Sequence, residues 1–275
     1  MRRRRIRSRN ATSSHIIVWF DVIIPWFIVW RWSRPVFRTT YRAEHVDQIA
    51  RQLMKHGVPR ERIINITDDP VGVKECRTFP LWSDHGGLHN ISGPHLPSCY
   101  RRLKLFDLDT LKSMGIAQGD RVVSLDIDAV ILQKFLDLFQ NKKGDFTGWQ
   151  VPGTVHPKVL NGSMWMFTAG KLQYLWDQFN SHKSPGMAAN AGYMGSDQGY
   201  LSYNLVGREF VSYWTHTDGV LCYTRDIRKL RLLPAHTKVV FFPGKLKPWD
   251  QQVLKESPWI KRYTVSSEKE LANAN

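Results

Sequence analysis

The sequence RVVSLDIDAVI, residues 121–131, sets the topology that we predict for this chain. Its apolar run predicts a buried strand, and two aspartates, Asp126 and Asp128, follow at the end of that strand. A carboxylate is costly to bring near a core unless something compensates its charge. The candidate explanations are a metal ion, a structural partner, or simple exposure at the strand end.

The segments before this stretch predict alternating strands and helices. WFIVWRW, residues 26–32, predicts a first buried strand. Residues 41–57 then have apolar residues at helical spacing that ends at a glycine, and residues 62–70 (RIINITDDP) predict a second strand. The order strand, helix, strand implies a parallel pair and an α/β sheet. We find no internal repeat and no clear linker, so we expect one domain.

The later segments continue this alternation. We expect a helix within residues 99–115, strands at 145–150 and 162–170, and a helix at 171–179. Residues 181–195 (SHKSPGMAANAGYMG) predict a flexible loop before a helix at 196–205.

The composition is that of a globular protein with a basic surface. The chain is 42% hydrophobic and 23% charged, and its formal net charge is +15. Six arginines lie in the first nine residues, and the remainder is still basic. An anionic partner such as a nucleotide, a nucleic acid or an anionic surface fits this balance. The alternative for the arginine-rich arm is a solvated segment with no specific role.

The cysteines and the N-terminal apolar stretch bear on location. The three cysteines include no CxxC pair, which indicates a reducing compartment and no zinc site. Residues 16–30 are apolar but contain Asp21 and Pro25, and they are shorter than the ~20 residues that a spanning helix needs. We therefore expect a strand here, with a membrane anchor as the alternative.

The position of the Asp-x-Asp pair distinguishes it from a second pair with the same spacing. Asp107 and Asp109 in FDLDT fall on a predicted amphipathic helix, where we expect them to face solvent. Asp126 and Asp128 lie at the carboxyl end of a parallel strand, where ligands bind in open α/β sheets. Two carboxylates there can hold a divalent cation that also binds a diphosphate. Their hard oxygen atoms suit manganese or magnesium.

Four blocks in order then show a family resemblance: LDIDAVI, NGSMWMF, GSDQGYLSY and GKLKPW. They resemble GT-A fold glycosyltransferases, especially the glycogenin-like and lipopolysaccharide galactosyltransferase group. The wider pattern of ITDDP, PSCYRRLKLF, WTHTDGV and VVFFPG is most similar to bacterial and phage-borne glycosyltransferases of unassigned acceptor. The resemblance covers roughly residues 24–250.

The resemblance implies a fold and domain limits. It implies a single-domain GT-A, Rossmann-like α/β fold with a mixed, mainly parallel central sheet flanked by helices. This domain would span residues 23–252. It would follow a basic arm and apolar lead-in (1–22) and precede a polar tail (253–275).

The resemblance also implies site residues. Asp126 and Asp128 would bind Mn²⁺ or Mg²⁺ and, through it, the donor diphosphate. Asn161 and Gly162 would lie near the donor sugar, unless they form only a turn before a strand. Asp197 and Gln198 match a pair beside the reactive carbon of the sugar; the alternative is a helix N-cap formed by Ser196 and Asp197.

Further residues would hold phosphate or acceptor. Lys247 would reach the diphosphate and balance the charge of the leaving group. Its matching neighbours in the block are Gly244, Pro248 and Trp249. Arg101, Arg102 and Lys104 are additional phosphate partners, although on a helix only some can face the cleft. Trp214 and Asp218 are candidate acceptor contacts.

The metal site departs from the pattern of the resembling group. Those proteins have a further histidine ligand three residues before, or directly before, the glycine of the last block. Phe241 and Pro243 stand at those positions and cannot bind a metal. His216 or His236 could substitute, water could fill the position, or the metal could bind weakly. The simpler interpretation is that both histidines are surface residues that bind no metal.

The resemblance thus implies a metal-dependent glycosyltransferase that moves a sugar from a nucleotide-sugar donor, a UDP-sugar, to a hydroxyl acceptor with retention. The acceptor is open: a glycan, a small molecule or a modified base in phage DNA. The expected location is the cytoplasm, that of the host if a phage encodes the chain. The alternative is a non-catalytic nucleic-acid-binding protein on a transferase-like scaffold. The arginine arm favours that alternative, and the intact aspartate pair and Lys247 oppose it.

Overall fold

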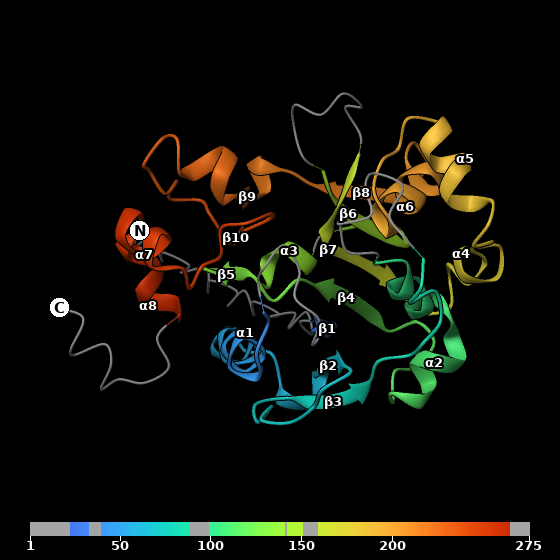
Figure 1. The fold of residues 1–275 in the computed structure, drawn as a ribbon, viewed down its shortest axis with the longest axis horizontal. Helices are drawn as coiled ribbons and strands as arrows, with labels where there is room; N and C mark the ends of the chain where they lie inside the picture. The colour runs from blue at the N-terminus through green and yellow to red at the C-terminus, as the bar shows by residue number, and fades with distance from the viewer. Residues whose placement is uncertain (1–22, 33–39, 89–98, 141, 151–158, 265–275) are drawn as a thin grey trace, which may run out of the picture.

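A seven-stranded mixed sheet forms the centre of the structure (Figure 1). The computed structural model describes residues 23–32, 40–88, 99–140, 142–150 and 159–264. The strand order is β3-β2-β1-β4-β7-β6-β8. The strands are β1 Trp26–Arg31, β2 Ile63–Thr67, β3 Arg77–Pro80, β4 Arg121–Leu125, β6 Phe146–Gln150, β7 Leu160–Thr168 and β8 Val211–Trp214.

Most neighbouring strands of this sheet are parallel. β1 pairs in parallel with β2 and β4, β2 with β3, and β6 with β8. β7 runs antiparallel to both β4 and β6. A smaller sheet has the order β5-β10-β9. It consists of β5 Ala129–Ile131, β9 Val220–Cys222 and β10 Val239–Phe241.

Helices cover both faces of the large sheet, which confirms the predicted mixed, mainly parallel α/β fold (Figure 1). The α-helices are α1 Ala43–Lys55, α2 Leu108–Ser113, α3 Asp137–Gln140, α4 Tyr174–Asp177, α5 Ser184–Asn190, α6 Asp197–Leu205, α7 Gln251–Glu256 and α8 Lys261–Thr264. The 3₁₀ helices are η1 Arg60–Arg62, η2 Tyr100–Phe106, η3 His216–Asp218 and η5 Pro258–Ile260, and η4 Tyr223–Ile227 is a π-helical turn. Within the described ranges, no helix is both long and apolar enough to span a bilayer.

Side chains of alternating orientation along the strands build three apolar clusters. Phe27 and Val29 of β1 join α1 and one face of the small sheet in the first cluster. Ile28 and Trp30 point to the other face, where η2, α2 and α6 pack. The third cluster joins the far face of the small sheet to η4, α7 and η5, and it buries Val253 and Ile260. Because side chains alternate along a strand, each central strand contributes to two cores.

Two local predictions need correction. Residues 99–115 form no continuous helix: η2 ends before Asp107, whose carboxylate accepts a hydrogen bond from Thr110 N at 3.1 Å and caps α2. The segment 181–195, predicted as a loop, contains α5. Pro185 lies in its first turn, where the missing N–H of proline costs no hydrogen bond.

Candidate active site

The Asp-x-Asp segment lies where the two sheets meet. Asp126 N donates a 2.9 Å hydrogen bond to Ser163 O on β7, and Phe242 N, just after β10, donates one of 3.1 Å to Asp128 O. Val29 is paired with Leu125, so the carboxyl ends of β1 and β4 are level. Both backbone contacts fix the two aspartates at the carboxyl edge of the parallel strands.

Arg102 joins this segment to the third sequence block, GSDQGYLSY. Its guanidinium donates a 2.9 Å hydrogen bond to Asp126 Oδ1 and a 2.7 Å hydrogen bond to Asp197 Oδ2. The Arg102 and Asp197 side chains are 4% and 2% exposed, so this ion pair is buried. A planar guanidinium can donate hydrogen bonds to two carboxylates at once in a fixed geometry. The ammonium group of a lysine, on its flexible stem, fixes the two carboxylates less well. Of the three basic residues predicted as phosphate partners, Arg102 contacts Asp126.

Lys247 holds the other aspartate of the pair. Its ammonium forms a buried ion pair with Asp128 Oδ2 and donates a 3.1 Å hydrogen bond to Phe242 O. Tyr41 donates a 3.0 Å hydrogen bond from its hydroxyl to the same Oδ2. The final sequence block therefore reaches the Asp-x-Asp pair from 119 residues away along the chain.

Gly162 and Gln198 lie beside Arg102. Gly162 N donates a 3.1 Å hydrogen bond to Gln198 Oε1. A Cβ on Gly162 would come within 2.7 Å of an Arg102 terminal nitrogen and within 3.7 Å of Asp197 Oδ1. Only a residue without a side chain leaves this space open. Asn161 instead turns back on its own strand, where its Oδ1 accepts a 2.8 Å hydrogen bond from Ser163 N.

The alternative of a helix cap at α6 is not what the side chains do. Ser196 occupies the N-cap position, but its hydroxyl makes no capping bond to a backbone N–H of the helix and instead donates a 3.3 Å hydrogen bond to Asp197 Oδ1. The same hydroxyl accepts a 2.9 Å hydrogen bond from Cys99 N. The Asp197 carboxylate is held by Arg102.

Trp249 closes the site on the side of α1. Its ring stacks on His45, with centroids 3.7 Å apart and planes inclined by 6°, and it meets Tyr41 edge-on at 5.9 Å. His45 Nδ1 accepts a 3.1 Å hydrogen bond from Arg42 N, so the neutral ring carries its proton on Nε2. Gly244 has a φ of +86°, a conformation that favours glycine, and lies away from these contacts.

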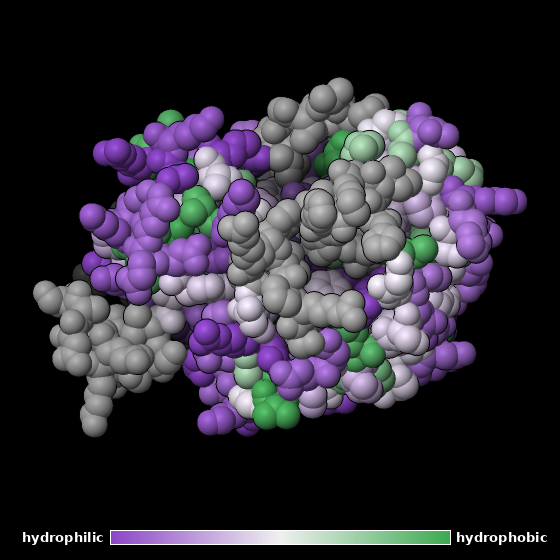
Figure 2. Space-filling model, in the orientation of Figure 1, coloured by the Kyte–Doolittle hydropathy of each residue, from purple (hydrophilic) through white to green (hydrophobic). Residues whose placement is uncertain are grey.

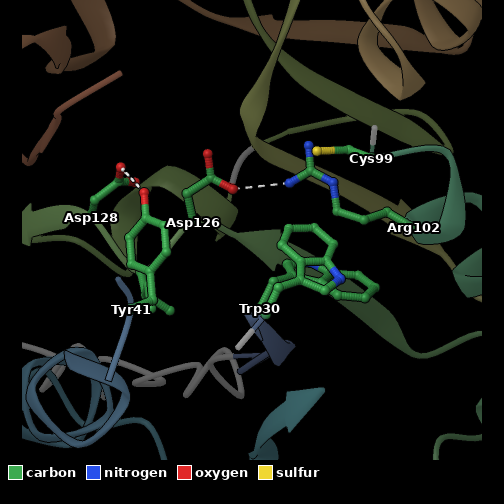
Figure 3. Close-up of a pocket in the computed structure, with 8 residues that line it drawn as sticks. Trp30, Tyr41, Cys99, Arg102, Asp126 and Asp128 are labelled. Atoms are coloured by element: carbon green, nitrogen blue, oxygen red, sulfur yellow. Dashed lines mark hydrogen bonds and ion pairs between the residues drawn. The ribbon is translucent and has the colours of Figure 1, made fainter. Parts of the chain in front are cut away.

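A pocket opens next to the Asp-x-Asp pair (Figure 3). Figure 3 shows the Tyr41 hydroxyl directed at Asp128 and the Arg102 guanidinium directed at Asp126, with the Trp30 indole below them. Trp30 and Trp32 are stacked with centroids 6.0 Å apart, and Trp30 Nε1 donates a 2.9 Å hydrogen bond to Ser124 Oγ. The lining residues are Trp30, Trp32, Tyr41, Cys99, Arg102, Asp126, Ile127 and Asp128.

Burial shifts the protonation equilibria of this site. Desolvation and the nearby Asp128 raise the pKa of Asp126 to about 6, against the opposite effect of Arg102. Desolvation also raises the pKa of Asp197, and that of the Cys99 thiol to about 12. The pKa of Arg102 is raised, because the attraction of Asp197 and Asp126 outweighs desolvation. The site therefore holds a permanent cation and a neutral thiol at neutral pH.

The donor atoms suit a divalent cation that is shared with a substrate. Asp126 uses Oδ1 for Arg102, and Asp128 uses Oδ2 for Lys247 and Tyr41, so each carboxylate has a second oxygen. The Asp126 side chain is 31% exposed, which leaves it accessible. Mg²⁺ is commonly held by one or two carboxylates together with substrate phosphates. The residues present therefore fit such an ion.

No histidine in the described part of the chain completes this set. Among those residues, no three His, Cys, Asp or Glu side chains gather in a group that could hold a metal. Phe241 is fully buried against Trp149, with ring centroids 4.9 Å apart. His236 contacts His216 O at 3.1 Å, and both histidines are exposed. The geometry thus gives neither histidine the place of the missing ligand.

Arg101 lies beside the pocket, over one of its lining residues, and the other predicted site residues contact other groups. Arg101 lies over the Trp32 ring at 6.0 Å, and Lys104 pairs with Asp84 at 2.7 Å. Trp214 is fully buried, and its Nε1 donates a 2.8 Å hydrogen bond to Leu138 O, which gives the indole a packing role. Asp218 pairs with Lys142 at 2.9 Å and accepts a hydrogen bond from Thr215 N.

Asp109 of the comparison pair faces solvent as predicted, whereas the prediction was wrong for Asp107, which is half-buried and accepts hydrogen bonds from Thr110. Asp107 caps α2, and the side chain of Asp109 is 87% exposed. Sequence reasoning missed Tyr41, His45 and the tryptophans of the pocket. A signal was present for Trp30 and Trp32, because they end a parallel strand next to the strand that ends at Asp126.

The mixed, mainly parallel α/β fold of this chain is shared by solved structures of glycosyltransferases. The galactosyltransferase LgtC, solved with donor and acceptor sugar analogs, is 15% identical and has a TM-score of 0.57, over 90% of this chain and 99% of LgtC. The glycosyltransferase GlyE of Streptococcus pneumoniae is 11% identical with a TM-score of 0.56, over 91% of this chain and 63% of GlyE. The bifunctional WbbM is 12% identical with a TM-score of 0.52, over 92% of this chain and 51% of WbbM. No family model and no curated protein sequence matches the chain.

Proposed function

We propose that this protein is a glycosyltransferase that moves a sugar from a nucleotide-sugar donor to a hydroxyl acceptor. The observation that carries the proposal is the double contact of Arg102 with Asp126 and Asp197. It brings the aspartate pair and the Asp197–Gln198 pair, which lie on separate elements, to one pocket edge. The shared fold with LgtC, a protein solved with donor and acceptor sugar analogs, supports the same reading.

The donor would lie along the carboxyl edge of β4. A Mn²⁺ or Mg²⁺ ion held by Asp126 and Asp128 would neutralise the diphosphate of the donor when bound. Lys247 supplies a further positive charge beside Asp128 for the departing nucleoside diphosphate. Gly162 leaves room near Arg102 and Gln198 for the sugar.

Asp197 and Gln198 would act on the sugar itself. Asp197 is held rigidly by Arg102, which fixes the orientation of its carboxylate. A charge placed beside the anomeric carbon stabilises an oxocarbenium-like transition state. We propose front-face attack by the acceptor hydroxyl with retention of configuration, and a UDP-sugar as the donor. The pocket beside these residues is where an acceptor can approach.

The test is calorimetric titration of UDP into the full chain with and without Mn²⁺. The double variant Asp126→Asn/Asp128→Asn should lose the metal-dependent binding. The chain offers a matched control in Asp107→Asn/Asp109→Asn, which has the same spacing outside the pocket and should bind as the unaltered chain does. Absence of binding for every nucleoside diphosphate would overturn the proposal and favour the nucleic-acid-binding alternative.

A positive result leads to a screen of UDP-sugars for donor hydrolysis and then for transfer. The anomeric configuration of the product, read by NMR, decides between retention and inversion. Labelled phage-type hydroxymethylated DNA belongs among the acceptors, because the chain is strongly basic.

A further inference from the structure

A basic turn with two exposed leucines lies on the far side of the small sheet. Lys229, Leu230, Arg231 and Leu232 are all exposed, and we call these four residues the KLRL turn. The leucines are 69% and 63% exposed. Among the described residues, no other two exposed large hydrophobic side chains lie so close in sequence. The two leucines alternate with Lys229 and Arg231, so apolar and cationic side chains are presented together on one exposed turn.

The turn is held firmly at its base. Arg228 forms two hydrogen bonds to Glu256 of α7, at 2.7 and 3.0 Å. Tyr223, at the start of η4, is fully buried and stacks on Phe242 with centroids 4.6 Å apart. On the other side, Leu233 packs against the third apolar cluster. The leucines thus project from a base that is anchored on both sides.

The surroundings of the turn are strongly basic. Residues 223–264 contain ten lysines and arginines against three aspartates and glutamates; of these cations, Lys247 is buried against Asp128, and Arg225 and Arg228 pair with Asp226 and Glu256. Lys255 is exposed on α7, next to the residue that anchors Arg228, and Arg262 is exposed on α8. Figure 2 shows mostly hydrophilic residues, with a few hydrophobic ones among them, at the end of the molecule where Figure 1 places α7.

We propose that the KLRL turn docks this protein on an anionic membrane surface. The lysine and arginine would approach acidic lipid headgroups, and the two leucines would enter the boundary between headgroups and acyl chains. Charge alone would also fit a nucleic acid. However, a phosphate backbone attracts cations but offers no apolar surface on which aliphatic side chains can be buried. The leucine pair therefore favours the bilayer. Docking is peripheral and does not depend on sugar transfer.

The experiment measures flotation of the full-length protein with vesicles. One set is phosphatidylcholine alone, and the other contains phosphatidylglycerol. Leu230→Ser/Leu232→Ser and Lys229→Glu/Arg231→Glu should each lower the partition coefficient onto the anionic vesicles about tenfold. Both pairs are exposed, so circular dichroism should report an unchanged fold.

Matched controls separate the turn from general hydrophobicity and general basicity of the surface. Val71→Ser removes a hydrophobic side chain that is 79% exposed on the loop after β2, and Lys55→Glu/Lys171→Glu reverses two exposed lysines elsewhere. Neither control should change the partition by more than about twofold. Hydrogen–deuterium exchange should show protection of residues 228–235 on anionic vesicles.

Three results would overturn the proposal. The first is equal partition of the leucine variant and the unaltered chain, which would assign any binding to charge outside the turn. The second is the absence of protection at 228–235 while the vesicles bind. The third is failure of all vesicles to bind while a DNA duplex protects the same residues.

Discussion

Arg102 donates a 2.9 Å hydrogen bond from its guanidinium to Asp126 Oδ1, across 24 residues of sequence. The same guanidinium contacts Asp197, 95 residues away. One buried cation therefore sets the relative positions of the residues that we assign to the metal and to the sugar. The residues around Arg102 determine the stability of the fold, its pH dependence and the binding of a nucleoside diphosphate.

Removal of Arg102 should destabilise the fold. Arg102→Ala leaves Asp197, whose side chain is 2% exposed, as an uncompensated buried carboxylate. We expect the free energy of unfolding to fall by about 3–5 kcal/mol, measured by urea denaturation. Lys112→Ala breaks an exposed ion pair and should cost less than about 1 kcal/mol. Similar losses for the two variants would contradict a buried role for Arg102.

Gly162→Ala should weaken the site through Arg102. The new methyl group would lie 2.7 Å from an Arg102 nitrogen that is already committed to two carboxylates. Relief of this clash should cost about 1–3 kcal/mol of stability and displace Arg102. Gly186→Ala is the control, because nothing lies within 4 Å of its Cβ and it is inside α5, where alanine stabilises. Melting temperatures that rise for both variants would refute the clash.

Lys247→Met should weaken binding of the nucleoside diphosphate. The substitution keeps the length of the side chain but removes the cation beside Asp128. We expect the affinity for UDP to fall at least about tenfold in calorimetry. Lys245→Met removes an exposed lysine of the same sequence block and should leave the affinity unchanged. Equal affinities of the two variants for UDP would show that Lys247 has only a structural role.

Stability should decline in mild acid because of His45. Burial lowers the pKa of this imidazole from 6.5 to about 4. Below pH ~6.5 the unfolded chain binds a proton that the folded chain does not, so the free energy of unfolding falls with falling pH. The loss between pH ~6.5 and ~5 should reach about 2 kcal/mol and should be smaller in His45→Gln. His182→Gln alters an exposed histidine and should keep the full pH dependence.

The Cys99 thiol should be unreactive in the folded protein. Its pKa is raised to about 12 by burial, so almost no thiolate is present at pH ~8. Alkylation followed by mass spectrometry should be more than about tenfold slower in the native chain than in urea. The native rate should rise with pH as the thiolate fraction grows. A native rate equal to that in urea would contradict a suppressed thiolate at Cys99, which is half-buried at the pocket.

The sequence by itself determined the elements with a strong local pattern. Apolar runs at 26–32 and 121–125 gave strands, and the spacing of Val46, Ile49 and Leu53 gave α1. The position of the Asp-x-Asp pair at the end of a parallel strand was predictable, because that edge of an α/β sheet is where ligands bind. The exposure of Asp109 also followed from the pattern around it, whereas the capping role of Asp107 did not.

Tertiary structure alone decided which cation meets which carboxylate. Arg101, Arg102 and Lys104 share a short segment, and only the packing of η2 against the sheet turns Arg102 inward. The contact of Lys247 with Asp128 joins two blocks that are 119 residues apart. Their separation along the chain does not predict their distance in space. The physical reason is that local periodicity fixes the face of an element. The partners of a buried charge are fixed by how distant elements pack, because an unpaired charge there is too costly to tolerate.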